Sequence, residues 1–156
     1  MPPARTLVIP MYREASRIGS TLAALATSDL NDPTTEVLLV DDGSDDGTPA
    51  LAKSVASELG LTVTVLELGV NQGKGAAVRA GVLASHGAVV AFADADLATD
   101  TTDIDACFRR VEEGPDEVVV ATRSHPDSVI TVAAPRHRVV MGRAYNGFLR
   151  VLGLTQ

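Results

Sequence analysis

The chain has 156 residues, of which 46% are hydrophobic and 21% charged, a balance typical of one folded globular domain and not of a disordered chain. Its net charge of −7 and its isoelectric point near 4.8 argue against non-specific binding of nucleic acid, which depends on clustered lysines and arginines.

Short runs rich in β-branched residues predict five buried strands, and amphipathic stretches between them predict helices. In chain order the expected strands are 6–10, 36–40, 62–67, 88–93 and 117–121. The expected helices are 14–27, 48–59, 75–85, 102–112 and a last one over 137–152. Because strand and helix alternate, the sequence predicts an α/β fold with a doubly wound, mostly parallel sheet and helices on both faces.

Polar residues follow the first four predicted strands, at the sheet edge where doubly wound folds bind ligands. These segments are residues 11–14, 41–44, 71–75 and 94–96. Since the carboxyl ends of parallel strands meet at one edge, the sequence predicts a single ligand site there.

Asp94 and Asp96 follow a fully apolar strand. Carboxylate oxygens are the ligands that Mg²⁺ and Mn²⁺ prefer, and Mg²⁺ is often held by one or two carboxylates together with phosphate oxygens and water. A pair of aspartates that only stabilises a turn or a helix start is the alternative for this short motif.

A second acidic segment, residues 41–47, does not fit a calcium-binding loop, because Lys53 would stand where that loop requires a glutamate. Asp41 or Asp42 is instead expected to accept hydrogen bonds from a ribose or a base edge. Asp46 or Thr48 is expected to cap the following helix.

The glycine-flanked Lys74 lies at the start of a predicted helix, where free N–H groups and the helix dipole favour an anion. The spacing of the surrounding glycines fits neither a Walker A loop nor a dinucleotide-binding motif, so a P-loop NTPase and a Rossmann dehydrogenase are disfavoured. Arg79, one turn further, either adds a second positive charge to this site or is an exposed helix residue.

Charge is distributed unevenly along the chain. Residues 1–122 hold 8 Lys or Arg against 19 Asp or Glu, whereas residues 123–156 hold five Arg against Asp127 alone. The C-terminal segment therefore faces an anion or an anionic membrane surface, or its arginines solvate one face of a helix.

The longest apolar run covers residues 88–93, far short of the roughly 20 residues that span a bilayer, and no secretion signal opens the chain. The single cysteine, Cys107, excludes an internal disulfide. A cytoplasmic protein, peripheral at the cytoplasmic membrane face if it meets a membrane, is expected. His86, His125 and His137 are expected to be structural or solvated, and the sequence indicates no oligomeric state.

Four segments, in their order and spacing, resemble the successive motifs of family 2 glycosyltransferases with the GT-A (Rossmann-like) fold. They are IPMYRE (9–14), VDDGSDDGT (40–48), NQGKGAAVRAG (71–81) and DADLATD (94–100). Within that family the chain is most similar to polyprenyl-phosphate sugar synthases of the dolichyl-phosphate β-glucosyltransferase branch. The similarity lies in the sequences GKGAAVRAG and DADLAT, and in ATRSHPDS before the arginine-rich stretch. The resemblance covers residues 6 to about 153.

The resemblance implies roles for individual residues. It implies that a nucleotide-sugar donor, with UDP or GDP, meets Pro10, Tyr12, Glu14, Asp41, Asp42, Gly73, Lys74, Arg79, Asp94 and Ala95. It implies that Asp94 and Asp96 bind Mg²⁺ or Mn²⁺ and act in catalysis together with Arg123, although Ala121 and Thr122 stand where the family usually has Gly-Ser. It implies that a polyprenyl-phosphate acceptor binds through its phosphate to Arg123, Arg136, Arg138 and Arg143.

The implied reaction moves a sugar, glucose from UDP-glucose in this branch, to a polyprenyl phosphate with inversion at the anomeric carbon. An acceptor phosphate is already ionised near neutral pH, so no strong general base is required. Family members usually continue beyond the point where this chain ends, so residues 1–156 are expected to form a single GT-A domain that is incomplete at its C-terminus. A nucleotide-sugar-binding module without transferase activity is the alternative, whereas a nucleotidyltransferase is disfavoured because no glycine-rich loop follows the first strand.

Overall fold

A computed structural model of the chain describes residues 3–114 and 118–122. Residues 1–121 form one compact unit, and of the second unit, residues 122–156, only Thr122 is described. The elements are β1 (Arg5–Met11), α1 (Ile18–Ala26), β2 (Thr35–Asp41), α2 (Thr48–Glu58), β3 (Val63–Glu67), α3 (Lys74–Ala84), β4 (Val89–Phe92) and α4 (Thr101–Glu113).

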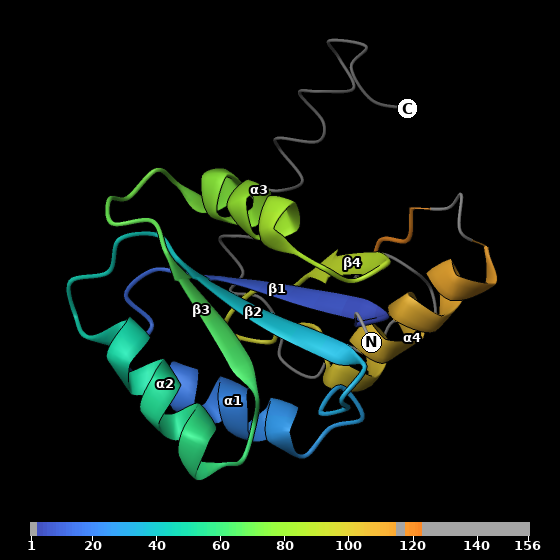
Figure 1. Cartoon of the computed structure of the whole chain (residues 1–156), viewed down its shortest axis with the longest axis horizontal. Coiled ribbons are helices and arrows are strands. Elements are labelled where there is room, and N and C mark those ends of the chain that lie inside the picture. The colour runs from blue at the N-terminus through green and yellow to red at the C-terminus, as the bar shows by residue number, and fades with distance from the viewer. Residues whose placement is uncertain (1–2, 115–117, 123–156) are drawn as a thin grey trace, which may run out of the picture. The chain divides into compact units, whose positions relative to one another are not determined.

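The four strands form one parallel sheet in the order β3-β2-β1-β4, with β1 and β2 at its centre (Figure 1). Met11, the last residue of β1, pairs with Asp41, which in turn pairs with Glu67 at the end of β3. The loops that follow the strands therefore leave the sheet at the same edge. This arrangement confirms the predicted α/β fold with a parallel sheet.

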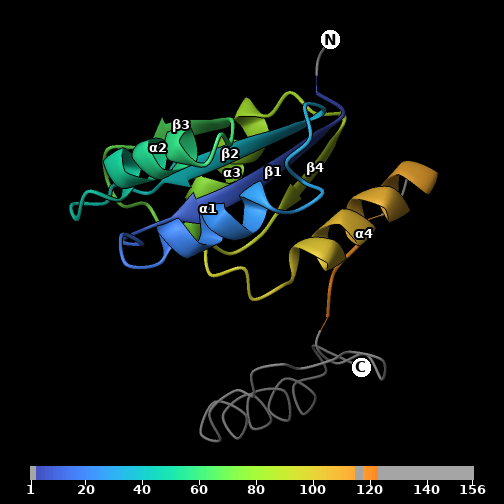
Figure 2. The same ribbon diagram turned by 90° about the horizontal axis from the view of Figure 1, so that it is seen from below.

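Helices cover both faces of the sheet, and the alternation of side chains along β1 separates two cores. Leu7 and Ile9 pack on the side of α1, α2 and α4, where Phe108 of α4 is also buried. Figure 2, seen from the side that carries α1 and α2, shows that α4 lies beside β4. Val8 packs on the opposite side, which α3 covers.

Small residues allow α3 to approach the sheet closely. Ala77 is fully buried against Val8 and Val40. A Cβ added to Gly81 would lie 2.3 Å from Cγ1 of Val8, so only glycine fits this position of the helix without displacing its neighbours. The close packing fixes the direction in which the N-terminus of α3 points.

One predicted strand is wrong in its described part. Val118 to Ala121 lie in no strand, and the side chains of Val118 and Val120 are almost fully exposed. Valines favour an extended conformation, but a strand needs a neighbour to pair with, and no strand of the described residues runs beside them. The predicted helix over 137–152 lies outside the described residues.

Helix α1 begins four residues later than predicted. The backbone N–H groups of Arg17 and Ile18 both donate to the carbonyl oxygen of Glu14, in a turn that precedes the helix. Arg13 has a positive φ of 54°, which interrupts a regular helical path through residues 13–14. The turn directs residues 12–17 across the sheet edge instead of away from it.

Arg5, the first residue of β1, connects the start of this strand to α4. Its guanidinium donates two hydrogen bonds of 2.6 Å to the carboxylate of Glu112 and one of 2.8 Å to Asp105. It also lies 5.4 Å from the ring centre of Phe108. The Arg5 side chain is 17% exposed and that of Asp105 is 9% exposed, whereas that of Glu112 is 36% exposed, so the Asp105 side of this cluster is the part shielded from water.

Replacing Arg5 by leucine should destabilise the protein by about 2 kcal/mol, because buried Asp105 and half-buried Glu112 lose a charge-assisted partner. Urea denaturation of the wild type and the variant measures this difference. Lys53→Met is the control, because it breaks the exposed Lys53–Glu67 pair and should cost less than about 1 kcal/mol. Equal losses in both variants would contradict the role given to Arg5.

The contribution of Arg5 should also depend on pH. Hydrogen bonds from Arg5 hold the pKa of Glu112 below its usual value of 4.5. A carboxyl group with a lowered folded pKa stabilises the folded state above its unfolded pKa, and this contribution is lost as the pH falls through the folded pKa. The difference in unfolding free energy between wild type and Arg5→Leu should therefore stay constant from pH 7 to about 5 and shrink below pH 4.5, as urea denaturation at each pH would show.

Candidate functional site

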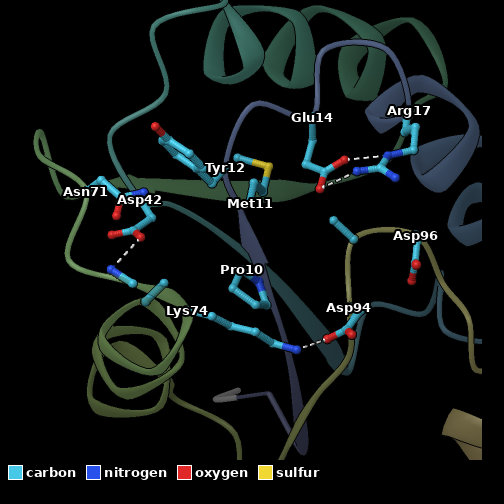
Figure 3. A pocket seen from close by; sticks show the side chains of 13 residues that line it. Pro10, Met11, Tyr12, Glu14, Arg17, Asp42, Asn71, Lys74, Asp94 and Asp96 are labelled. Atoms are coloured by element: carbon cyan, nitrogen blue, oxygen red, sulfur yellow. Dashed lines mark hydrogen bonds and ion pairs between the residues drawn. The ribbon is translucent and has the colours of Figure 1, made fainter. Parts of the chain in front are cut away.

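A pocket of about 310 Å³ opens at the carboxyl ends of β1, β2 and β4, beside the N-terminus of α3 (Figure 3). Its lining comprises Pro10, Met11, Tyr12, Glu14, Arg17, Asp42, Asn71, Gly73, Lys74, Ala77, Asp94, Ala95 and Asp96. All four polar segments predicted to converge at this edge therefore contribute to one cavity. Arg17 is a charged lining residue that the motifs do not reveal, although its spacing from Glu14, three residues earlier, is that of an ion pair on one helical face.

The segment after β1 forms one wall. Pro10 is buried, whereas Tyr12 is 40% exposed at the rim. The guanidinium of Arg13 lies 5.3 Å from the ring centre of Tyr12 and forms two hydrogen bonds with the carboxylate of Asp45, at 2.7 and 2.8 Å. These contacts hold the Tyr12 ring at the rim, where a flat apolar group could stack on it.

Glu14 and Arg17 form a bidentate ion pair at the same wall, with N–O distances of 2.7 and 2.9 Å. The hydrogen bonds that Arg17 donates to Glu14 raise the pKa of the Arg17 guanidinium. The backbone N–H of Glu14 donates to the hydroxyl of Thr48, 2.9 Å away at the start of α2. This bond connects the wall to the first residue of α2.

Asp41 and Asp42 are both buried but serve different loops. Asp41 accepts from the N–H groups of Gly43 and Ser44 at 3.1 and 2.9 Å, and it does not line the pocket. Its other oxygen, Oδ1, is buried without a hydrogen-bond partner. Asp42 lines the pocket, and its carboxylate accepts from the backbone N–H groups of Gln72 and Gly73, both at 2.8 Å.

Asp46 accepts from the backbone N–H of Thr48 at 3.1 Å and from its hydroxyl at 2.6 Å, next to the N-terminus of α2. These bonds lower the pKa of Asp46. The N-cap residue of α2 is Gly47, so neither Asp46 nor Thr48 takes the N-cap position that was predicted for one of them. Asp46 instead holds the first residue of the helix from one position before the cap, while the hydroxyl of Thr48 also accepts from Glu14.

The start of α3 forms the opposite wall. Gly73 precedes the helix with a φ of 91°, and no side chain caps the helix N-terminus. The ammonium of Lys74 reaches across the pocket to the Oδ1 atom of Asp94 (Figure 3). Uncapped N–H groups together with a lysine provide an environment suited to an anion.

The loop after β4 carries the predicted metal ligands. Ala95 is buried, and its carbonyl oxygen accepts from the hydroxyl of Thr21, which anchors the loop to α1. Asp96 accepts from the N–H of Ala98 at 3.0 Å, so it does stabilise a turn, as the alternative interpretation expects. Both Asp94 and Asp96 nevertheless line the pocket.

The donor atoms of this loop suit a divalent ion that also binds the ligand. Oδ2 of Asp94 and Oδ2 of Asp96 accept no hydrogen bond from any described residue. Within residues 3–114 and 118–122 there is no group of three or more His, Cys, Asp or Glu that could enclose a metal. Two carboxylates that leave several coordination positions to phosphate oxygens and water match the way proteins often hold Mg²⁺.

Some predicted site residues lie elsewhere. Arg79 is exposed on α3 and does not line the pocket. His86 pairs with Glu36 at 2.9 Å, near the start of β4, which agrees with a structural role. The predicted acceptor residues Arg123, Arg136, Arg138 and Arg143 lie outside the described residues, as do His125 and His137.

A family model described as glycosyl transferase family 2 matches residues 6–154. The chain is 32% identical over 149 residues to the glycosyltransferase AglD of Haloferax volcanii, covering 94% of this chain and 23% of that protein. It is 37% identical over 132 residues to a dolichyl-phosphate beta-glucosyltransferase of Drosophila melanogaster, covering 77% of this chain and 40% of that protein. It is 31% identical over 121 residues to a dodecaprenyl-phosphate galacturonate synthase of Rhizobium johnstonii, covering 77% of this chain and 36% of that protein.

Solved structures agree with the fold. A mannosyltransferase from Pyrobaculum calidifontis, in complex with GDP-Man and Mn²⁺, has 31% identity and a TM-score of 0.56, covering 62% of this chain and 28% of that one. TarS of S. aureus has 24% identity and a TM-score of 0.62, covering 84% and 40%, and supports the fold alone. The predicted GT-A fold is confirmed. The chain spans less than half the length of each of these proteins.

The described part of the chain contains no helix that is both long and apolar enough to cross a bilayer.

The pocket depends on the close approach of two loops at Gly43. A Cβ added there would lie 2.6 Å from the carbonyl carbon of Val70, and φ is +76°. Gly43→Ala should therefore cost the strain of a left-handed alanine, about 1 kcal/mol, and about 2 kcal/mol more for displacing residues 70–71.

Gly60→Ala is the matched control, because φ is +66° there and the added Cβ would meet nothing within 4 Å. It should cost only the backbone strain, about 1 kcal/mol. Urea denaturation of both variants isolates the cost of the close approach, and equal losses would show that the two loops adjust freely.

Proposed function

Because the chain belongs to glycosyl transferase family 2, we propose that it transfers a sugar from a nucleotide-sugar donor to a polyprenyl phosphate. The observation that carries this proposal is the pocket that joins the aspartate pair, Lys74 and the N-terminus of α3 beside the exposed ring of Tyr12. The names of the relatives, which include dolichyl-phosphate and dodecaprenyl-phosphate sugar transferases, support the acceptor class.

We place the two parts of the donor along the two walls of the pocket, the segment at the end of β1 and the start of α3. The nucleoside lies against Pro10 and Tyr12, near Glu14 and Asp42, and the diphosphate lies near Lys74 and the uncapped N–H groups of α3. We propose UDP-glucose as the donor, in line with the dolichyl-phosphate beta-glucosyltransferases among the relatives, with a GDP-sugar as the competing donor. Asp41 supports the loop under this site through Gly43 and Ser44 and takes part only indirectly.

Asp94 and Asp96 would hold Mg²⁺ or Mn²⁺. When bound, such an ion acts as a Lewis acid that stabilises the negative charge on the departing diphosphate. Lys74 adds a full positive charge close to the same group, and the N-terminus of α3 adds oriented N–H donors. The mannosyltransferase with GDP-Man and Mn²⁺ supports the use of a divalent ion in this fold.

An oxygen of the acceptor phosphate attacks the anomeric carbon as the bond from that carbon to the diphosphate oxygen breaks, and the electron pair leaves with the nucleoside diphosphate. In-line attack inverts the anomeric centre. The acceptor phosphate is already ionised, so the protein mainly positions it. We assign this task to Arg123, Arg136, Arg138 and Arg143, and we place the protein at the cytoplasmic membrane face, where a lipid acceptor would be reached.

Asp96→Ala should abolish the metal-dependent part of donor binding, because the ion loses one of its two carboxylates. Calorimetric titration of the wild type with UDP-glucose and GDP-mannose, in Mg²⁺ or Mn²⁺ and then in EDTA, should reveal one preferred donor. Its affinity should fall at least tenfold, about 1.4 kcal/mol, in EDTA and in Asp96→Ala.

Asp103→Ala is the control for this titration, since Asp103 is an exposed carboxylate on α4 that does not line the pocket. It should bind the donor as the wild type does. Binding that is indifferent to EDTA would refute the proposed metal site. Donor binding without transfer to a polyprenyl phosphate would favour the binding-module alternative.

A further inference from the structure

Asp42 is held in a geometry that suits the support of another loop. Its Oδ1 accepts from the backbone N–H of Gln72 and its Oδ2 from that of Gly73, both at 2.8 Å. The residue is only 2% exposed, so its carboxylate is shielded from water, although the donors lie in a more exposed loop. Charge-assisted bonds of this length are stronger than bonds between neutral groups.

We infer that Asp42 is a positioning residue: it fixes the loop 71–73 and thereby the N-terminus of α3 and Lys74, which face the diphosphate of the donor. The inference rests on the proposed function for the identity of the ligand. It deepens that proposal, because it gives Asp42 a task in the diphosphate half of the site, through α3.

The two hydrogen bonds from Gln72 and Gly73 to Asp42, called the Asp42 clamp below, act where α3 starts. Gly73 directly precedes α3, and its φ of 91° and ψ of 156° are favoured only for glycine. Its carbonyl oxygen accepts from Ala76 and Ala77 in the first turn. A bond to the N–H of Gly73 therefore fixes the peptide from which the helix starts.

The surrounding packing makes the clamp stiff. Gly43, next to Asp42, lies so close to Val70 and Asn71 that no Cβ fits between them. Lys74, the first residue of α3, forms an ion pair with Asp94. The clamp therefore joins the end of β2 to the aspartate loop after β4 through residues 72–74.

Neighbouring Asp41 shows that this arrangement is not general for the acidic segment. Its carboxylate accepts from Gly43 and Ser44 of its own loop and from no backbone N–H of residues 71–73. Loss of Asp41 would disturb the β2–α2 loop, whereas loss of Asp42 would release the β3–α3 loop.

The test compares nucleoside with nucleoside diphosphate. Calorimetric or NMR titrations with uridine and UDP, with guanosine and GDP in parallel, are made in EDTA on the wild type and on Asp42→Asn. The amide of asparagine would present an NH₂ group to one of the two backbone N–H donors, so the clamp opens on one side. We expect the affinity for the diphosphate to fall about tenfold more than the affinity for the nucleoside.

Gly73→Ala provides a second variant that leaves the Asp42 carboxylate intact. It strains the peptide at the helix start, and a Cβ there meets nothing within 4 Å. The clamp predicts the same selective loss of diphosphate affinity. Asp32→Asn and Gly60→Ala are the matched controls, an aspartate that holds the backbone N–H of Thr34 and a glycine of positive φ, both outside the pocket.

Amide hydrogen exchange in the ligand-free protein tests the clamp without any nucleotide. Exchange at Gln72 and Gly73 should accelerate at least tenfold in Asp42→Asn and stay unchanged in Asp32→Asn. If no nucleotide binds to the wild type, the proposed function fails, and the exchange rates still decide whether Asp42 holds this loop. Unchanged exchange, or an equal loss of nucleoside and diphosphate affinity in Asp42→Asn, would overturn the inference.

Discussion

The structure depends on one constraint, the parallel pairing of four strands around β1 and β2. Parallel strands end at the same edge, so the four following loops leave their backbone N–H groups close together and beyond the reach of the sheet's own hydrogen bonds. Short acidic side chains satisfy many of them. Asp41, Asp42, Asp46 and Asp96 each accept from at least one backbone N–H in these loops.

The same acids also determine the electrostatics of the pocket. Glu14 is paired with Arg17 on one wall, and Asp94 is paired with Lys74 across the cavity. The two cations that line the pocket are thus held by carboxylates of the site itself. Binding of a diphosphate would offer Lys74 a second anionic partner, and a divalent ion would offer one to Asp94. The Lys74–Asp94 pair therefore compensates the charges of these two side chains before ligands enter.

The fold was largely predictable from the sequence because buried parallel strands appear as short apolar runs, and the glycines and prolines between them mark the turns. The runs at residues 36–40 and 88–93 lie within one residue of β2 and β4. Val118 and Val120 show where this reasoning stops, because their preference for an extended backbone does not specify a neighbour. The start of α1 was also missed, since the positive φ of Arg13 leaves no signal in the composition of the segment.

The site was predictable at the level of segments and less so at the level of single side chains. Pro10, Tyr12, Lys74 and Asp94 line the pocket because each lies at or just after the end of a strand or at the start of a helix, a position that the pattern reveals. Arg17 was missed because its place depends on the turn before α1.

Asp41 and Asp42 illustrate the same limit within one dipeptide. Strand alternation directs the last residue of β2, Asp41, toward the face of Leu39, so it serves its own loop. The next residue leaves the strand, and its carboxylate finds the N–H groups of Gln72 and Gly73, thirty positions later in the chain. No local pattern in the sequence contains that pairing. It exists because β2 lies between β1 and β3, which brings the ends of β2 and β3 together, and because Gly43 allows the two loops to touch.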